Sequence, residues 1–249
     1  MGKAVASHAG NGPQGYQQQR YRSLDQAWVN WREQRLLARL LTLCQLVNGT
    51  VLDVPCGYSR FAPLYARLGI TAVGADMSYD MAHLAAATHK RHSAEGWLCA
   101  DILALPFPDS MFDSVLCIRL LHHRFSDAER QRILTELARV SRRFVIISFY
   151  QPTLLHALAR HWRGARGRLA MMTAARLQEL AQASGLQVQR VHALLRFCHA
   201  QTFAVLTKIP PSYPNLGAPC ERTEAQGRQA LPPPGGKGSR ARGSEGDKR

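Results

Sequence analysis

The feature that most constrains the fold is the stretch at 51–60, which reads Val-Leu-Asp-Val-Pro-Cys-Gly-Tyr-Ser-Arg. Residues 50–54 have the aliphatic, β-branched composition of a buried strand, Gly57 permits a sharp turn, and 59–68 have helical spacing. In a strand–turn–helix unit of this kind, backbone N–H groups and the positive end of the helix dipole point toward the same ligand position. The stretch therefore predicts a binding site for a nucleotide-like ligand.

The residues that follow alternate between short apolar runs and helical patterns. We expect strands at 71–75, 97–100, 112–118 and 144–149, and helices at 79–90 and 127–140. A helix at 173–185 and two strands at 186–195 and 202–207 predict a closing antiparallel hairpin. Strands separated by helices of this length form parallel sheets covered on both faces. The predicted fold is α/β, with a doubly wound, mostly parallel, Rossmann-like sheet of seven strands.

Composition divides the chain into three parts. Residues 1–22 are rich in Gly, Gln, Ser and Ala without periodicity, and we expect a flexible N-terminus. Residues 23–208 form one predicted domain, which opens with a helix that ends near residue 48. The Pro/Gly-rich basic tail at 209–249 is predicted to be disordered. There is no long apolar run and no signal-peptide pattern, so an intracellular, cytoplasmic protein is expected.

The net charge of +15 is large for 249 residues, and twelve of these charges belong to residues 1–220. Such a surplus favours an anionic partner, which could be RNA, a membrane surface or an acidic metabolite. Residues 152–172 contain four arginines and no acidic residue. Arg163 and Arg166 in this segment are candidate contacts to an acceptor. The alternative is a solvated helix packed on the sheet edge.

Two nucleotide-binding motifs are absent. The chain has no phosphate-binding loop and no Gly-x-Gly-x-x-Gly fingerprint. Pro55, Gly57 and Ser59 stand where a three-glycine turn would have its glycines, so only the middle glycine is present. The turn therefore suits a cofactor without phosphates. Asp76 follows Asp53 by 23 residues, about the spacing at which a carboxylate after the second strand accepts hydrogen bonds from ribose. There is no Cys-x-x-Cys pair, and no metal site is expected.

At this point the stretch 51–149 resembles the core of class I S-adenosylmethionine-dependent methyltransferases, of the kind called methyltransferase type 11. The resemblance lies in Val-Leu-Asp-Val-x-Cys-Gly at 51–57, Val-Gly-Ala-Asp-Met-Ser at 73–78 and Ala-Asp-Ile-Leu-Ala-Leu-Pro-Phe at 100–107. It continues with Phe-Asp-Ser-Val-Leu at 112–116, Leu-Leu-His-His at 120–123 and Glu-Leu-Ala-Arg-Val at 136–140. The order and spacing match throughout. The resemblance implies S-adenosylmethionine as the cofactor.

The resemblance also implies roles for individual positions. Asp53 and Gly57 are expected near the methionine end of the cofactor, and Asp76 at the ribose hydroxyls. The remaining implied cofactor contacts are Met77, Asp101 and Ile102 around adenine, and Ile118 and Arg119 on the methionine side. For the aliphatic positions, simple packing in the core is the competing interpretation.

Methyl transfer needs a general base only when the acceptor loses a proton. His122 and His123 are the catalytic candidates, with helix-starting or packing roles as alternatives, and Tyr58 and Arg60 are candidate substrate contacts. The Asn-Pro-Pro-Tyr motif typical of enzymes that methylate exocyclic base nitrogens is absent, so a small-molecule or lipid-like acceptor is expected. The alternatives are RNA methylation at another atom and a non-catalytic, partner-binding subunit.

Overall fold

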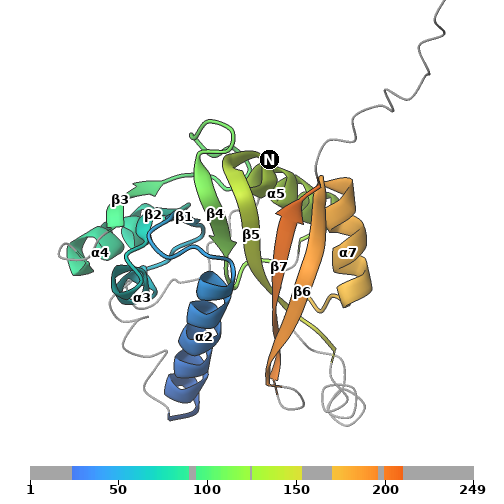
Figure 1. Ribbon diagram of the computed structural model, residues 1–249, viewed down its shortest axis with the longest axis horizontal. Helices are drawn as coiled ribbons and strands as arrows, with labels where there is room; N and C mark the ends of the chain where they lie inside the picture. The colour runs from blue at the N-terminus through green and yellow to red at the C-terminus, as the bar shows by residue number, and fades with distance from the viewer. Residues whose placement is uncertain (1–23, 90–93, 124, 153–169, 196–198, 210–249) are drawn as a thin grey trace, which may run out of the picture. The chain divides into compact units, whose positions relative to one another are not determined.

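The computed structural model describes residues 24–89, 94–123, 125–152, 170–195 and 199–209, and contains twelve helices and strands within these ranges (Figure 1). The helices are α2 (Leu24–Leu43), α3 (Ala62–Arg67), α4 (Tyr79–Thr88), α5 (Asp127–Val140) and α7 (Ala174–Ala183). The strands are β1 (Thr50–Asp53), β2 (Thr71–Asp76), β3 (Ala94–Cys99), β4 (Phe112–Cys117), β5 (Ser141–Tyr150), β6 (Leu186–Leu195) and β7 (His199–Lys208).

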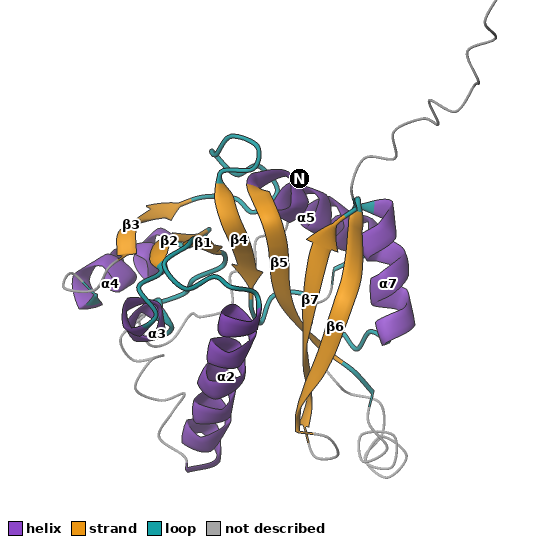
Figure 2. Ribbon diagram, in the orientation of Figure 1, coloured by secondary structure: helices purple, strands orange, loops and turns teal. Residues whose placement is uncertain are grey.

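These strands form one seven-stranded sheet in the order β3-β2-β1-β4-β5-β7-β6 (Figure 2). The first five strands pair in parallel, with Leu52 of β1 opposite Val73 of β2 and Val115 of β4. Strand β7 enters antiparallel to β5 and closes a hairpin with β6. This arrangement confirms the predicted doubly wound sheet with its C-terminal antiparallel hairpin.

The sheet separates two hydrophobic cores because successive side chains of a strand point to opposite faces. Val51 and Ile146 face a core shared with α2 and α3, whereas Leu52 and Ile147 face a core shared with α5 and α7. All four side chains are fully buried. Both faces are therefore covered, as strands of continuous aliphatic composition require.

Local sequence explains where the helices begin. Ser126 and Glu129 form a reciprocal capping box at the start of α5, and the Thr173 hydroxyl caps α7. Helix α3 begins at residue 62 instead of 59 because Ser59 has a positive φ of 56°, which lies outside helical geometry. The predicted turn after β1 is thus longer than the sequence pattern indicates.

Several predictions fall outside the described residues. They are the flexible segment at 1–22, the tail beyond residue 209, and Arg163 and Arg166. The three-part division of the chain stays a prediction.

Candidate cofactor site

The carboxyl ends of the parallel strands bring the predicted cofactor residues to one edge of the sheet. Gly57 follows β1, Asp76 ends β2, Asp101 follows β3, and Arg119 follows β4. In open α/β sheets, ligands bind beyond this edge, where the strand order reverses. Here the reversal lies between β1 and β4, which are neighbours in the sheet.

Asp76 connects the glycine turn to the start of α4. Its Oδ2 accepts the Gly57 N–H at 2.9 Å, and its Oδ1 accepts the Ser78 N–H at 2.9 Å. Gly57 has a φ of +55°, a conformation that glycine adopts without strain. An ionised carboxylate offers about four acceptor positions, so two hydrogen bonds leave capacity for a ligand. The half-buried side chain is held in a defined orientation at the edge of the sheet.

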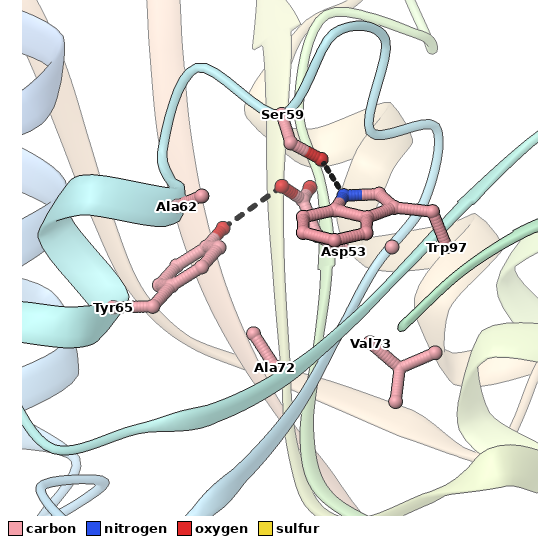
Figure 3. A pocket seen from close by; sticks show the side chains of 8 residues that line it. Asp53, Ser59, Ala62, Tyr65, Ala72, Val73 and Trp97 are labelled. Atoms are coloured by element: carbon pink, nitrogen blue, oxygen red, sulfur yellow. Dashed lines mark hydrogen bonds between the residues drawn. The ribbon is translucent and has the colours of Figure 1, made fainter. Parts of the chain in front are cut away.

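Behind the turn, Ser59 is buried and its Oγ accepts a hydrogen bond from the Trp97 indole N–H (Figure 3). The indole of Trp97 crosses Gly74 of β2, where a Cβ atom would come within 2.5 Å of the ring. Side chains from β1, α3, β2 and β3 enclose a cavity of about 10 Å³ here, the size needed for one water. Serine at the last position of the expected glycine pattern therefore has its own partner beneath the turn.

Asp53 lies in the same enclosed region and is 2% exposed. Its Oδ2 accepts the Tyr65 hydroxyl at 3.0 Å, and both side chains point into the cavity (Figure 3). Burial raises the pKa of Asp53 to about 7, against the lowering effects of the Tyr65 hydroxyl and the Arg60 charge. Asp53 can therefore change its charge near neutral pH.

A buried ionic cluster joins α2 to the turns after β1 and β4. Glu33 of α2 is fully buried, and its Oε2 lies 2.6 Å from both Arg60 Nη1 and Arg119 Nη2. Arg119 Nε donates to Oε1 at 2.9 Å, which makes the pair bidentate, and Gln201 Nε2 of β7 donates to the same oxygen. Arg60 also donates to the Asn30 side chain. Residues from four distant parts of the chain meet at one carboxylate.

The two arginines determine the charge state of Glu33. Burial opposes its ionisation, but the charges and hydrogen bonds of Arg60 and Arg119 outweigh burial and hold the pKa of Glu33 below its usual value. The side chains of Arg60 and Arg119 are only 12% and 13% exposed. The structure thus gives both predicted ligand contacts a partner within the protein.

The two histidines after β4 differ in environment. His122 is buried, with its ring 4.4 Å from that of His123 and 4.7 Å from that of Tyr150. His123 is exposed, and its backbone oxygen accepts a hydrogen bond from Arg130. Of the pair, His123 is the one that solvent or an acceptor can reach.

The remaining predicted site residues lie at or near the same edge. Met77 is 54% exposed, and Asp101 is exposed with its Oδ1 accepting the Leu103 N–H at 2.9 Å. Ile102 packs against the core shared with α5, and Ile118 is buried in the core shared with α2. The Tyr58 backbone oxygen bonds the His89 ring at 3.1 Å. The structure therefore favours a packing role for Ile118.

Sequence reasoning missed Glu33, Trp97 and Gln201. Glu33 had a readable signal, because it lies four residues after Val29 and four before Leu37, on the buried side of α2. A carboxylate on the apolar side of a helix needs a buried cationic partner. Trp97 and Gln201 had no comparable signal, since their partners come from the turn after β1 and from α2, and only the folded sheet brings them together.

Sheet order and site geometry together define a class I methyltransferase fold, and solved structures share it. The magnesium protoporphyrin IX methyltransferase of Synechocystis PCC 6803, crystallised with bound SAH, aligns with a TM-score of 0.63. The alignment covers 75% of this chain and 88% of that one, at 20% sequence identity.

The sequence also resembles a known family. Residues 51–143, which are 93 of the 249 residues, match the family model described as "Methyltransferase domain". The malonyl-acyl-carrier-protein O-methyltransferase of Pectobacterium atrosepticum is 33% identical over 112 residues, which are 45% of this chain and 42% of that protein. The human protein named probable tRNA methyltransferase 9B is 29% identical over 96 residues, or 39% and 20% of the two chains. The chain thus spans less than half the length of these curated relatives.

The described residues contain no helix long and apolar enough to cross a membrane. They also contain no cluster of three or more His, Cys, Asp or Glu side chains that could hold a metal ion.

Proposed function

We propose that this chain is an S-adenosylmethionine-dependent methyltransferase that acts on a small-molecule or lipid-like acceptor. The observation that supports it most directly is Asp76, whose carboxylate is fixed by two backbone N–H groups at the carboxyl edge of the sheet. A carboxylate in this place can accept both hydroxyls of a ribose. The family match over residues 51–143 supports the same cofactor.

The other edge residues have distinct roles in this proposal. Gly57 lets the backbone pass close to the cofactor, Met77 covers the adenine, and Asp101 with Ile102 contacts the adenine edge. Asp53 and Arg119 lie on the methionine side. The cofactor, when bound, supplies a methyl group on a positively charged sulfur.

The protein's contribution to methyl transfer is to hold donor and acceptor in line and to exclude water. Positioning alone can accelerate such a displacement, because no proton has to move unless the acceptor carries one on the attacking atom. For acceptors of that kind, the exposed His123 is the proposed base. His122 packs beneath it and orients it through their stacked rings.

Calorimetric titration with S-adenosylmethionine tests the proposal. Asp76→Asn removes the charge and one acceptor oxygen, and we expect it to weaken binding roughly 10- to 100-fold, since hydrogen bonds to a charged group contribute about 1.5–3 kcal/mol. Asp80→Asn, an exposed carboxylate in the first turn of α4, is the matched control. A wild-type protein that binds no cofactor at millimolar concentration would leave the non-catalytic, partner-binding alternative.

The acceptor requires a separate experiment. The name of the Synechocystis protein specifies a porphyrin acceptor, which motivates the small-molecule proposal, whereas the name of the Pectobacterium protein specifies an acyl group on a carrier protein. Incubating a cell extract with the wild-type protein and a cofactor labelled in its methyl group, and then separating metabolites, lipids and RNA, identifies the class that gains label. The same incubation without the added protein serves as the blank.

RNA is the second candidate acceptor. The name of the human relative and the charge of +15 favour it. Label recovered in RNA, and absent from lipids and metabolites, would replace the first proposal with this one.

A further inference from the structure

The solvent side of α2 combines aromatic and basic side chains. The inner side of the helix is packed on the sheet through Val29, Leu37 and Leu40, whereas Trp28 and Trp31 are 47% and 48% exposed. At about 100° per residue, all the exposed side chains except Ala27 fall within about 120° of the helix circumference. We call them the outer stripe, which consists of Trp28, Trp31, Arg32, Arg35, Arg39, Thr42 and Leu43.

The outer stripe carries three positive charges and no negative charge. Arg32 lies over the Trp28 ring at 5.7 Å, and Arg35 lies over the Trp31 ring at 4.8 Å. Among the described side chains of α2, the one carboxylate is Glu33, which is fully buried on the other side of the helix. Cation–π contacts keep each guanidinium close to its indole. The stripe therefore presents charge and aromatic surface together.

We propose that the outer stripe is a docking surface for an anionic phospholipid bilayer. Tryptophan favours the boundary between head groups and acyl chains, because the indole has an apolar body and a polar N–H. Arginine binds phosphate groups, and basic side chains on a surface helix are attracted to anionic lipids. Tryptophan and arginine therefore occur together along the outer stripe, as binding at the surface of an anionic bilayer requires.

The shape of the stripe favours a bilayer over a nucleic acid. Helix α2 is about 30 Å long at 1.5 Å per residue, and the outer side of a helix is a convex surface. Single-stranded nucleic acids bind in grooves and stack on aromatic faces, but here an arginine lies over each indole. Leu43, which is 51% exposed, adds an aliphatic contact that suits lipid. A flat partner can touch the whole stripe.

This docking surface would orient the molecule. Glu33, on the inner side of the same helix, holds Arg60 and Arg119 in the turns after β1 and β4. A bilayer bound to α2 is thereby connected to the edge of the sheet that carries the candidate cofactor site. Docking itself does not depend on the proposed methyltransferase activity and can be measured without cofactor or acceptor.

Cosedimentation of the full chain with vesicles tests the proposal. We expect binding to phosphatidylcholine vesicles that contain about 30% phosphatidylserine, little binding to phosphatidylcholine alone, and weaker binding as salt rises above about 0.1 M. Arg35→Gln with Arg39→Gln should weaken binding about 25-fold, since each arginine near an anionic surface contributes about fivefold. Trp28→Ala with Trp31→Ala should weaken it at any salt concentration.

The control variant is Arg132→Gln, which removes one positive charge from an exposed site on α5, across the sheet, and is compared with the roughly fivefold effect expected for one arginine of the outer stripe. It should change vesicle binding less than twofold, and circular dichroism should show every variant folded. Three results would overturn the proposal: no binding to phosphatidylserine vesicles, equal weakening by Arg132→Gln, or stripe variants that bind like wild type. Displacement of the protein from vesicles by a single-stranded RNA oligonucleotide, with loss of RNA binding in Arg35→Gln/Arg39→Gln, would also overturn it by assigning the stripe to nucleic acid.

Discussion

Glu33 is an ionised carboxylate without solvent contact, so its charged form is stabilised by the positive charges of Arg60 and Arg119 and not by water. Replacing it with glutamine keeps the size of the side chain and leaves two guanidinium groups close together without a counter-charge. Breaking a buried ion pair on one side costs about 3–5 kcal/mol. We therefore expect Glu33→Gln to lower the free energy of unfolding by that amount in urea titrations at neutral pH.

The pH dependence separates this effect from a loss of packing. Because the pKa of Glu33 is lowered in the folded protein, its stabilising effect is present above its unfolded pKa and is lost as the pH falls through the folded one. The difference between wild type and Glu33→Gln should thus narrow in acid. The control is Glu136→Gln, which breaks the more exposed pair with Arg139 and should cost less. A pH-independent difference would contradict the electrostatic account.

The raised pKa of Asp53 predicts the opposite pH dependence of the free energy of unfolding. Its folded pKa of about 7 lies above the unfolded value, so the protonated form is stabilising below the unfolded pKa, and this stabilisation is lost as the pH rises to about 7. Between these values wild type should lose up to about 4 kcal/mol relative to Asp53→Asn, at about 1.4 kcal/mol per pH unit. The asparagine keeps an oxygen that can accept the Tyr65 hydroxyl.

Urea unfolding of both proteins at several pH values between 4 and 8 measures this difference. Asp80→Asn, at an exposed position, should follow the wild-type curve. If Asp53→Asn follows it as well, the carboxyl of Asp53 ionises in the folded protein as it does in the unfolded chain.

At the scale of elements, the strands were predictable because their signals are local. The runs at 50–54, 112–118 and 144–149 are mostly apolar, and the structure places β1, β4 and β5 there, with β5 extended to Ser141–Tyr150. The bounds of the third strand were predicted less precisely: the sequence predicted 97–100, and the structure has Ala94–Cys99. Residues 94–96, Ala-Glu-Gly, have no strand composition, and pairing with β2 brings them into the sheet.

The site was predictable where it depends on strand ends, and unpredictable where it depends on side chains that cross between elements. Asp76 and Gly57 adjoin because parallel strands end at the same edge, which the alternating pattern already implies. The contacts of Trp97 with Ser59 and Gly74 span three elements and follow no sequence period. Helix α2 shows both cases. Its apolar stripe could be predicted from the sequence, whereas the partners of Glu33 could not.

At the scale of the whole molecule, the sheet is a layer between two cores that touch different sets of helices. Ile146 and Ile147 are adjacent in β5 and fully buried, yet Ile146 packs toward α2 and Ile147 toward α5. Across the ladder, Ile146 is paired with Val205 of β7, which belongs to the same core. Adjacency in the chain therefore predicts an energetic coupling between Ile146 and Ile147, whereas shared packing predicts a coupling between Ile146 and Val205.

We expect shared packing, and not adjacency in the chain, to determine which pair of residues is energetically coupled. Ile146→Val and Ile147→Val should each cost about 0.5–1.5 kcal/mol, and the double variant should equal their sum within about 0.5 kcal/mol, because the two side chains share no cavity. Ile146→Val with Val205→Ala should deviate from additivity, since both changes open space in one core. Double-mutant cycles from urea unfolding measure both couplings. A large coupling between Ile146 and Ile147 would mean that the cores relax together through the sheet, and that the sheet is not a rigid partition between them.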